Sequence, residues 1–124
     1  MKHALVIEDN SLIAMMIGEE LVDHGYESVE IATSQDQAIQ MAKVRCPDLV
    51  TVDDKLDSGT GVDTIREICR EQAIPVVFIT ADPDAIEKSI LDAIIVPKPF
   101  SRPQLTAAIE AAIHSPMIID ETSP

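Results

Sequence analysis

The sequence predicts an α/β protein in which five parallel strands form a doubly wound sheet with helices on both faces. Short runs of apolar, β-branched residues recur along the chain, and a segment with apolar residues at helical spacing follows each run. Runs this short, without alternation, are typical of strands that are buried on both faces, as in parallel sheets. Strands that alternate with helices favour parallel pairing, because each helix returns the chain to the same end of the sheet.

Five segments are expected as strands. Four of them are continuous apolar runs that we expect to be buried on both faces: residues 4–7 (ALVI), 49–52 (LVTV), 76–79 (VVFI) and 93–96 (AIIV). The segment ESVEIA, residues 27–32, alternates between polar and apolar residues. It is therefore expected as a weaker, edge-like strand.

Five helices are expected between and after these strands: residues 11–24, 34 to near 47, 61–72, 84–91 and 102–114. Gly25 ends the first helix, because glycine readily adopts the backbone conformation that follows a helix. Ser34 opens the second helix with a side chain that can accept a bond from a free amide. Pro103 fits the first turn of the last helix, where no backbone amide is needed.

The length of 124 residues is that of one domain, with enough chain for a core that needs no disulfide bond or structural metal. We expect the domain to span residues 1–115. The segment that follows breaks the alternating pattern, and residues 116–124 are expected to form a flexible tail or to fold on a partner.

The formal net charge of −13 limits the partners of the protein. A surface this acidic repels phosphate backbones and anionic lipids, so we expect neither nucleic acid nor a membrane as a partner. Acidity alone is also common in proteins that are merely soluble. No apolar run reaches the roughly 20 residues of a membrane span, and no signal-peptide pattern is present, so we expect a cytoplasmic protein.

The cysteines and histidines show no metal-ligand spacing. Cys46 and Cys69 are expected as reduced, mostly buried thiols. The three histidines are expected at the surface: His3, His24 and His114.

Polar side chains follow the expected strands at the points where the strands end. The carboxyl ends of parallel strands meet at one edge of the sheet, where doubly wound folds bind their ligands. Carboxylates this close repel one another, and Mg²⁺ is the cation that such oxygen ligands suit. The side chains are Glu8 and Asp9 after the first strand, Asp53 and Asp54 after the third, Thr80 after the fourth and Lys98 after the fifth.

Four motifs carry a resemblance to a known family: VIEDN (6–10), PDLVTVDDKLDSGTG (47–61), VVFITA (76–81) and VPKPF (96–100). In this order and spacing, they resemble the receiver domains of two-component response regulators. The likeness covers about residues 1–115. It implies a single-domain receiver similar to the chemotaxis receivers, with a flavodoxin-like (βα)5 fold and strand order 2-1-3-4-5.

The resemblance assigns roles to the residues at the strand ends. Asp9 and Asp53 would bind Mg²⁺ directly, and Glu8 would act largely through water. The backbone carbonyl of Lys55 would supply a further ligand, so its side chain need not match the family. Asp53 would also be the phosphoacceptor, whereas Asp54 is expected to be a solvated turn residue.

Thr80 and Lys98 would hold the oxygens of the bound phosphoryl group and act as switch residues. The bond between Lys98 and Pro99 resembles the cis peptide bond of the family.

Three positions that flank the site depart from the commonest receiver pattern. Ile95 stands where many receivers carry Tyr or Phe, so we expect the switch to use a smaller change or the segment 82–89. Lys55 and Asp82 flank the phosphoryl position with opposite charges. They form either an ion pair across the mouth of the site or two independent solvated side chains.

The resemblance implies a phosphoacceptor rather than a turnover enzyme. A histidine kinase or a histidine phosphotransfer protein would donate the phosphoryl group, with the first helix as its docking site. Met15 and Met16 on that helix are nevertheless interpreted as core residues. An unidentified downstream protein would bind the face of the fourth helix, fifth strand and fifth helix, unless the protein only drains phosphate from a relay. We expect a monomer and leave open whether phosphorylation causes dimerisation.

Three other classes of function are weaker. A phosphohydrolase with an aspartyl nucleophile needs a second acid where Lys55 stands. A flavin or nucleotide binder needs a phosphate cradle after the first strand, where EDNSLI instead offers carboxylates. A degenerate receiver that serves only as a scaffold would not need the full set of site residues.

Overall fold

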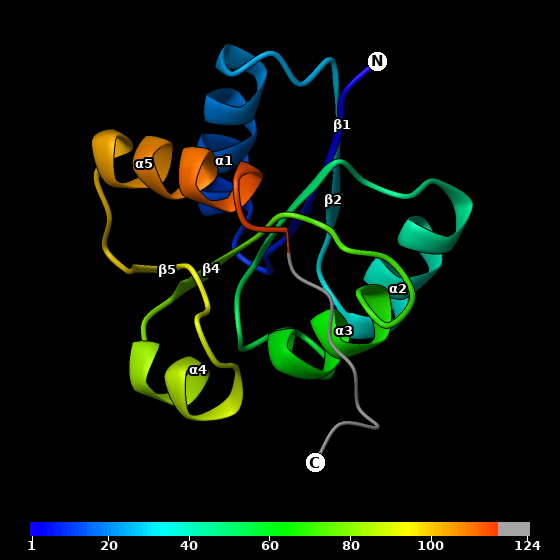
Figure 1. Cartoon of the computed structure of the whole chain (residues 1–124), viewed down its shortest axis with the longest axis vertical. Helices are drawn as coiled ribbons and strands as arrows, with labels where there is room; N and C mark the ends of the chain where they lie inside the picture. The colour runs from blue at the N-terminus through cyan, green and yellow to red at the C-terminus, as the bar shows by residue number, and fades with distance from the viewer. Residues whose placement is uncertain (117–124) are drawn as a thin grey trace.

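The computed structural model describes residues 1–116, and Figure 1 shows a central sheet with helices on both of its faces. The strands in this part of the chain are β1 (His3–Ile7), β2 (Ser28–Ala32), β3 (Leu49–Val52), β4 (Val76–Thr80) and β5 (Ile95–Pro97). The helices are α1 (Ser11–Asp23), α2 (Gln35–Val44), α3 (Gly61–Ile68), α4 (Pro83–Ser89) and α5 (Arg102–Ile113). All strand pairs are parallel, in the order β2-β1-β3-β4-β5, which confirms the predicted fold and strand order.

The predicted helix and strand bounds are correct to within a few residues. The α3 helix ends at Ile68 rather than at the predicted Gln72, because the backbone of Cys69 leaves the helical conformation with φ −93° and ψ 12°. The β5 strand runs from Ile95, two residues later than predicted. Periodicity shows where apolar side chains recur, but it does not show where the hydrogen-bond ladder stops.

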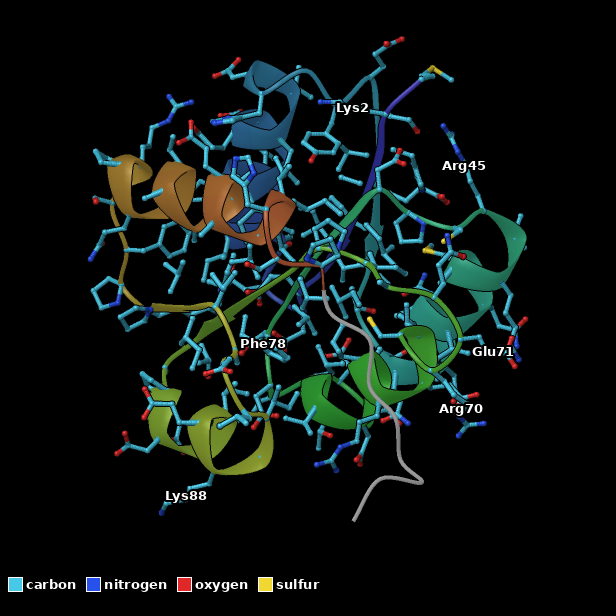
Figure 2. All side chains as sticks on the ribbon, viewed as in Figure 1. Lys2, Arg45, Arg70, Glu71, Phe78 and Lys88 are labelled. Atoms are coloured by element: carbon cyan, nitrogen blue, oxygen red, sulfur yellow. The ribbon has the colours of Figure 1, made fainter. Side chains whose placement is uncertain are left out.

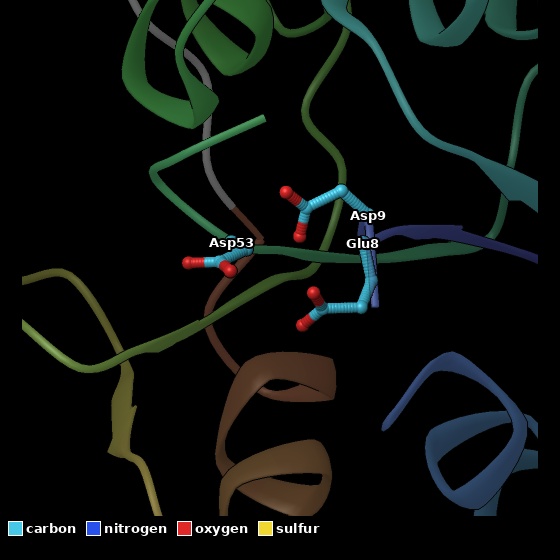
Figure 3. A group of neighbouring side chains, drawn as sticks. All are labelled: Glu8, Asp9 and Asp53. Carbon is cyan, nitrogen blue, oxygen red and sulfur yellow. The ribbon is translucent and has the colours of Figure 1, made fainter. Parts of the chain in front are cut away.

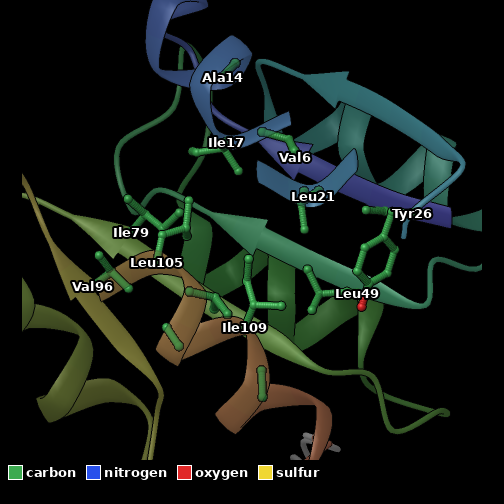
Figure 4. Packing of buried hydrophobic residues seen from close by; sticks show 14 residues of the cluster. Val6, Ala14, Ile17, Leu21, Tyr26, Leu49, Ile79, Val96, Leu105 and Ile109 are labelled. Carbon is green, nitrogen blue, oxygen red and sulfur yellow. The ribbon is translucent and has the colours of Figure 1, made fainter. Parts of the chain in front are cut away.

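Two apolar cores fill the space between the sheet and its helices. The α1 and α5 helices cover one face through Ile17, Leu21, Leu105 and Ile109, which lie close together in Figure 4. The other face carries α2, α3 and α4. Phe78 of β4 lies in this second core, while charged side chains such as Lys88 project from the outside (Figure 2).

Several residues lie in surroundings that differ from those predicted. His3 was expected at the surface but is buried, and its ring contacts Ser28 Oγ and Glu30 Oε1, each at 3.0 Å. These polar partners on β2 make the burial of an imidazole possible. Cys46 is exposed, whereas Cys69 is buried as expected. Met15 and Met16 are exposed rather than core residues, because they lie on the outer side of α1.

The expected flexible tail, residues 116–124, lies outside the described residues except for Pro116, which is exposed. In the described part of the chain, no helix combines the length and the apolar character that crossing a lipid bilayer requires.

A polar cluster joins α1 to α5 on the surface of the first core. Glu20 is 5% exposed and accepts hydrogen bonds from Thr106 Oγ1 at 2.6 Å and from Arg102 Nε at 2.8 Å. Arg102 also contacts Asp23 at 2.8 Å. The bond from Thr106, followed by the bond and charge of Arg102, lowers the pKa of Glu20 against the effect of burial. The ionised carboxylate therefore stabilises the packing of the two helices.

The buried hydroxyl of Thr51 has no hydrogen-bond partner among the described residues. Thr51 lies between Val6 and Val77 in the sheet, on the side of the α1–α5 core. We expect the Thr51→Val variant to be more stable by about 1 kcal/mol, because it replaces an unsatisfied hydroxyl with a methyl group of similar size. Urea unfolding at pH 7 measures the change, and a loss of stability would show that the hydroxyl has a partner.

We expect the Glu20→Gln variant to be less stable than the wild type by about 1–2 kcal/mol at pH 7, because it loses charge-assisted hydrogen bonds. The folded-state pKa of Glu20 lies below its unfolded-state value of about 4.3. Its contribution is therefore present above that pH and is lost as the pH falls through the folded-state pKa. Urea unfolding at pH 7 and at about pH 3 tests this. An equal difference at both pH values would contradict it.

Candidate functional site: three carboxylates and a lysine

The polar residues at the strand ends meet at one edge of the sheet. Glu8 and Asp9 follow β1, and Asp53 follows β3, its direct neighbour in the sheet. Thr80 ends β4, and Lys98 follows β5. Because these four strands are adjacent and parallel, their carboxyl ends bring the side chains together.

Three carboxylates form the centre of the site. Glu8, Asp9 and Asp53 each offer an oxygen atom, and these atoms all lie within 4.8 Å of one another. Figure 3 shows the three side chains at the strand ends, with Asp9 and Glu8 extending to opposite sides of their strand and Asp53 on the neighbouring one. Asp9 is exposed, whereas Glu8 is 1% and Asp53 is 9% exposed. Of the three carboxylates, that of Asp9 is therefore the most open to solvent.

Burial is the main reason that the pKa of Glu8 is raised, and the charge of Asp53 raises it further. The bonds from Lys98 and from the Asn10 amide act in the opposite direction. Burial thus disfavours the charged form of Glu8, and a nearby cation reduces that cost.

Lys98 supplies positive charge to this centre. Its ammonium Nζ donates to Glu8 Oε1 at 2.7 Å and to Asp53 Oδ2 at 2.8 Å. Burial alone would lower the pKa of Lys98, but the bonds to Asp53 and Glu8 outweigh burial and raise it. The lysine therefore stays charged. Its ammonium contacts residues at the ends of β1 and β3, neither of which is adjacent to β5 in the sheet.

The ends of β4 and β5 are tied together beside the cluster. The Lys98 amide donates to the Thr80 carbonyl at 2.8 Å, and the Lys98–Pro99 peptide bond is cis. The Thr80 hydroxyl is buried and accepts a bond from the Asp82 amide at 3.0 Å. A hydroxyl and an ammonium thus lie on the same side of Asp53.

The backbone of Asp53 packs closely against the start of α3. A Cβ atom at Gly61 would overlap the carbonyl oxygen of Asp53 and contact the Val52 side chain. Only glycine leaves room for α3 to begin this close to the end of β3.

A cleft of about 360 Å³ leads to Asp53 and is also lined by Asp54, Lys55, Thr80 and Asp82, together with Ala81 and Lys98. The Asp82 carboxylate accepts a bond from the Ala85 amide at 3.3 Å and caps α4. Within the described residues it forms no ion pair with Lys55, whose side chain is exposed. Lys55 and Asp82 thus flank the cleft independently and do not form the ion pair that was the alternative expectation.

Ile95 lies away from the cluster of charges. It pairs with Phe78 across the sheet and packs against the second core, beside α4. One residue near the site, Gln35 at the start of α2, was missed from the sequence. Its only sequence signal is its place directly after the helix cap Ser34.

The sequence from residue 4 to residue 110 matches the family model of the response regulator receiver domain. The chain belongs to this family. The transcriptional regulatory protein PdtaR of Mycobacterium tuberculosis is 36% identical over 117 residues, which are 90% of this chain and 57% of PdtaR. This chain thus spans little more than half the length of that relative.

Solved structures agree with this family. The receiver domain of the response regulator PhyR from Erythrobacter litoralis has a TM-score of 0.82 at 27% identity, and the match covers 99% of this chain and 94% of that domain. The receiver domain of the sensor histidine kinase PA1611 from Pseudomonas aeruginosa has a TM-score of 0.77 at 25% identity, over 92% and 98% of the two chains. That structure has a magnesium ion coordinated in its active-site cleft.

The residues of this chain fit a hard divalent cation. Three carboxylates supply oxygen atoms close together, and the exposure of Asp9 leaves room for water ligands. Mg²⁺ prefers such a set, with few carboxylates and several waters.

We expect the Lys98→Met variant to be less stable by about 2–4 kcal/mol, because Glu8 and Asp53 then face each other without their cation. Lys88→Met is the matched control, since Lys88 is exposed on α4. It should change stability by less than about 0.5 kcal/mol. Urea unfolding at pH 7 without divalent metal measures both. Equal losses in the two variants would show that the buried ion pairs do not stabilise the fold.

Proposed function

We propose that the protein is a phosphoacceptor switch of a two-component pathway, with Asp53 as the acceptor. The observation that carries the proposal is the ammonium of Lys98 between Glu8 and Asp53, in a centre of three carboxylates. A buried salt bridge alone would not need the third, exposed carboxylate of Asp9. A centre for phosphoryl transfer needs both a cation site and a fixed positive charge beside the nucleophile.

Glu8, Asp9, Asp53 and the carbonyl of Lys55 would hold Mg²⁺, with Glu8 acting largely through water. When bound, Mg²⁺ neutralises negative charge on the transferred phosphoryl group. An oxygen of Asp53 forms the new bond to phosphorus, while the bond from phosphorus to the histidine nitrogen of the donor breaks. The electron pair stays on that nitrogen.

Lys98 and Thr80 then bind the oxygens of the phosphoryl group, the lysine by charge and the threonine by donating a hydrogen bond. For this, Lys98 must exchange Asp53 Oδ2 for a phosphoryl oxygen. The exchange would move the end of β5 and the segment 82–89, which is α4 with its cap, because the Thr80 hydroxyl is bonded to the Asp82 amide. The packing of Ile95 against the core supports a small movement of β5.

The donor would be a histidine kinase or a histidine phosphotransfer protein. Exposed apolar side chains on α1 support a donor that docks beside the site: Leu12, Met15 and Met16 are 70%, 56% and 51% exposed. A downstream protein would bind the face of α4, β5 and α5. We also propose a cytoplasmic location for this protein and its donor.

The absence of a second acid two residues after Asp53 supports a phosphoacceptor rather than a turnover enzyme, since Lys55 occupies that position. We also propose that residues 1–115 are the folding unit. The family match ends at residue 110, and α5 ends at Ile113.

Incubation with acetyl phosphate, followed by intact-mass spectrometry, tests the function. We expect a single phosphoryl adduct that requires Mg²⁺ and is absent from the Asp53→Asn variant. Asp54→Asn is the matched control, because it removes the neighbouring carboxylate in the same cleft and should keep the adduct. An adduct that persists in Asp53→Asn, or no adduct in any protein, would contradict the proposal.

A further inference from the structure

The loop that would supply the carbonyl ligand of the metal is exposed for most of its length. It connects β3 to α3, and residues 57–60 are exposed. A ligand on such a loop is useful only if the loop keeps one conformation, because a binding-competent state that is partly populated weakens the observed affinity.

The base of the loop is closed by backbone pairing. Lys55 and Thr60 form an isolated antiparallel bridge, and the Gly61 amide donates to the Asp54 carbonyl at 2.8 Å. Because the bond runs between the flanking residues, Lys55 and Thr60 are a non-hydrogen-bonded antiparallel pair. In such a pair, the amide and carbonyl groups of the two bridged residues point away from each other. The carbonyl of Lys55 and the amide of Thr60 are thus both available to partners outside the loop.

The partner of the Thr60 amide is the side chain of Gln35. Its Oε1 accepts the hydrogen bond at 3.2 Å. The backbone amide of Gln35 also donates to the Ser58 carbonyl at 2.9 Å, and the backbone amide of Asp57 donates to the Thr33 carbonyl at 3.1 Å. The start of α2 therefore holds three successive parts of the loop, and Gln35 makes two of the three bonds.

The absence of a side chain at Gly59 allows the Gln35 side chain to pack against the loop. Gly59 has a φ of 85°, which lies in the left-handed region that favours glycine. A Cβ atom at this position would overlap the side-chain oxygen and the Cβ of Gln35. The loop and the glutamine side chain thus interlock.

We propose that Gln35 is a positioning residue for the metal site. It does not touch the metal. Its side chain fixes Thr60, and the bridge from Thr60 fixes Lys55 and its carbonyl. Gln35 thereby sets the affinity for the divalent cation. The inference rests on the proposed function, since it requires Lys55 to be a metal ligand.

The test compares the wild type with Gln35→Ala and Gln40→Ala. Gln40 is exposed on the same helix and serves as the matched control. Isothermal titration with Mg²⁺ alone should show about three- to tenfold weaker affinity for Gln35→Ala, the loss expected from one neutral hydrogen bond in the second layer of a site. Gln40→Ala should bind as the wild type does.

Hydrogen exchange gives a second readout that does not depend on metal. Without Mg²⁺, the Thr60 amide should exchange faster in Gln35→Ala than in the wild type. Gln35→Glu keeps an acceptor oxygen and should restore the protection. Thermal unfolding of each variant verifies that the fold is intact.

The outcomes separate the two proposals. Equal Mg²⁺ affinity in the wild type and Gln35→Ala overturns the role of Gln35 and leaves the proposed function standing. If the Thr60 amide exchanges at the same rate in Gln35→Ala as in the wild type, the role of Gln35 is overturned as well. A wild-type protein that does not bind Mg²⁺ overturns the proposed function, and the inference with it.

Discussion

The ion pairs of Lys98 are the interaction on which the site depends. One ammonium lies 2.7 Å from Glu8 and 2.8 Å from Asp53, and Glu8 is almost fully buried. Without this charge, the end of β1 would place a buried carboxylate against the end of β3. The order of the strands makes the pairing possible, because β4 and β5 carry the lysine to the edge at which the acids gather.

Backbone packing also holds this edge of the sheet in place. Gly61 lets α3 start against the Asp53 carbonyl, and Thr60 both caps α3 and takes part in the bridge to Lys55. The start of α2 holds the other side of this loop. The acidic cluster thus lies at the ends of paired strands, beside a loop that is hydrogen-bonded to a neighbouring helix.

The sequence predicted the sheet and the polar residues at its edge because both follow from short-range patterns. Apolar runs locate the strands, and parallel strands bring Glu8, Asp53 and Lys98 to one edge. Three features could not be predicted in this way. The burial of His3 depends on Ser28 and Glu30 of β2. The Asp82 carboxylate caps α4 rather than pairing with Lys55. The contact of Gln35 with Thr60 joins the start of α2 to the loop before α3, and no periodicity predicts such a contact.

The two charged contacts of the last segment have a consequence for synthesis of the chain. Lys98 reaches Glu8 across 90 residues, and Arg102 reaches Glu20 across 82. Contacts of such separation form late, because the intervening chain must be closed first. A nascent chain that has released β1 to β4 from the ribosome still lacks the cation of its acidic edge. A chain truncated before β5 therefore cannot complete this edge, and such products are candidates for aggregation and proteolysis.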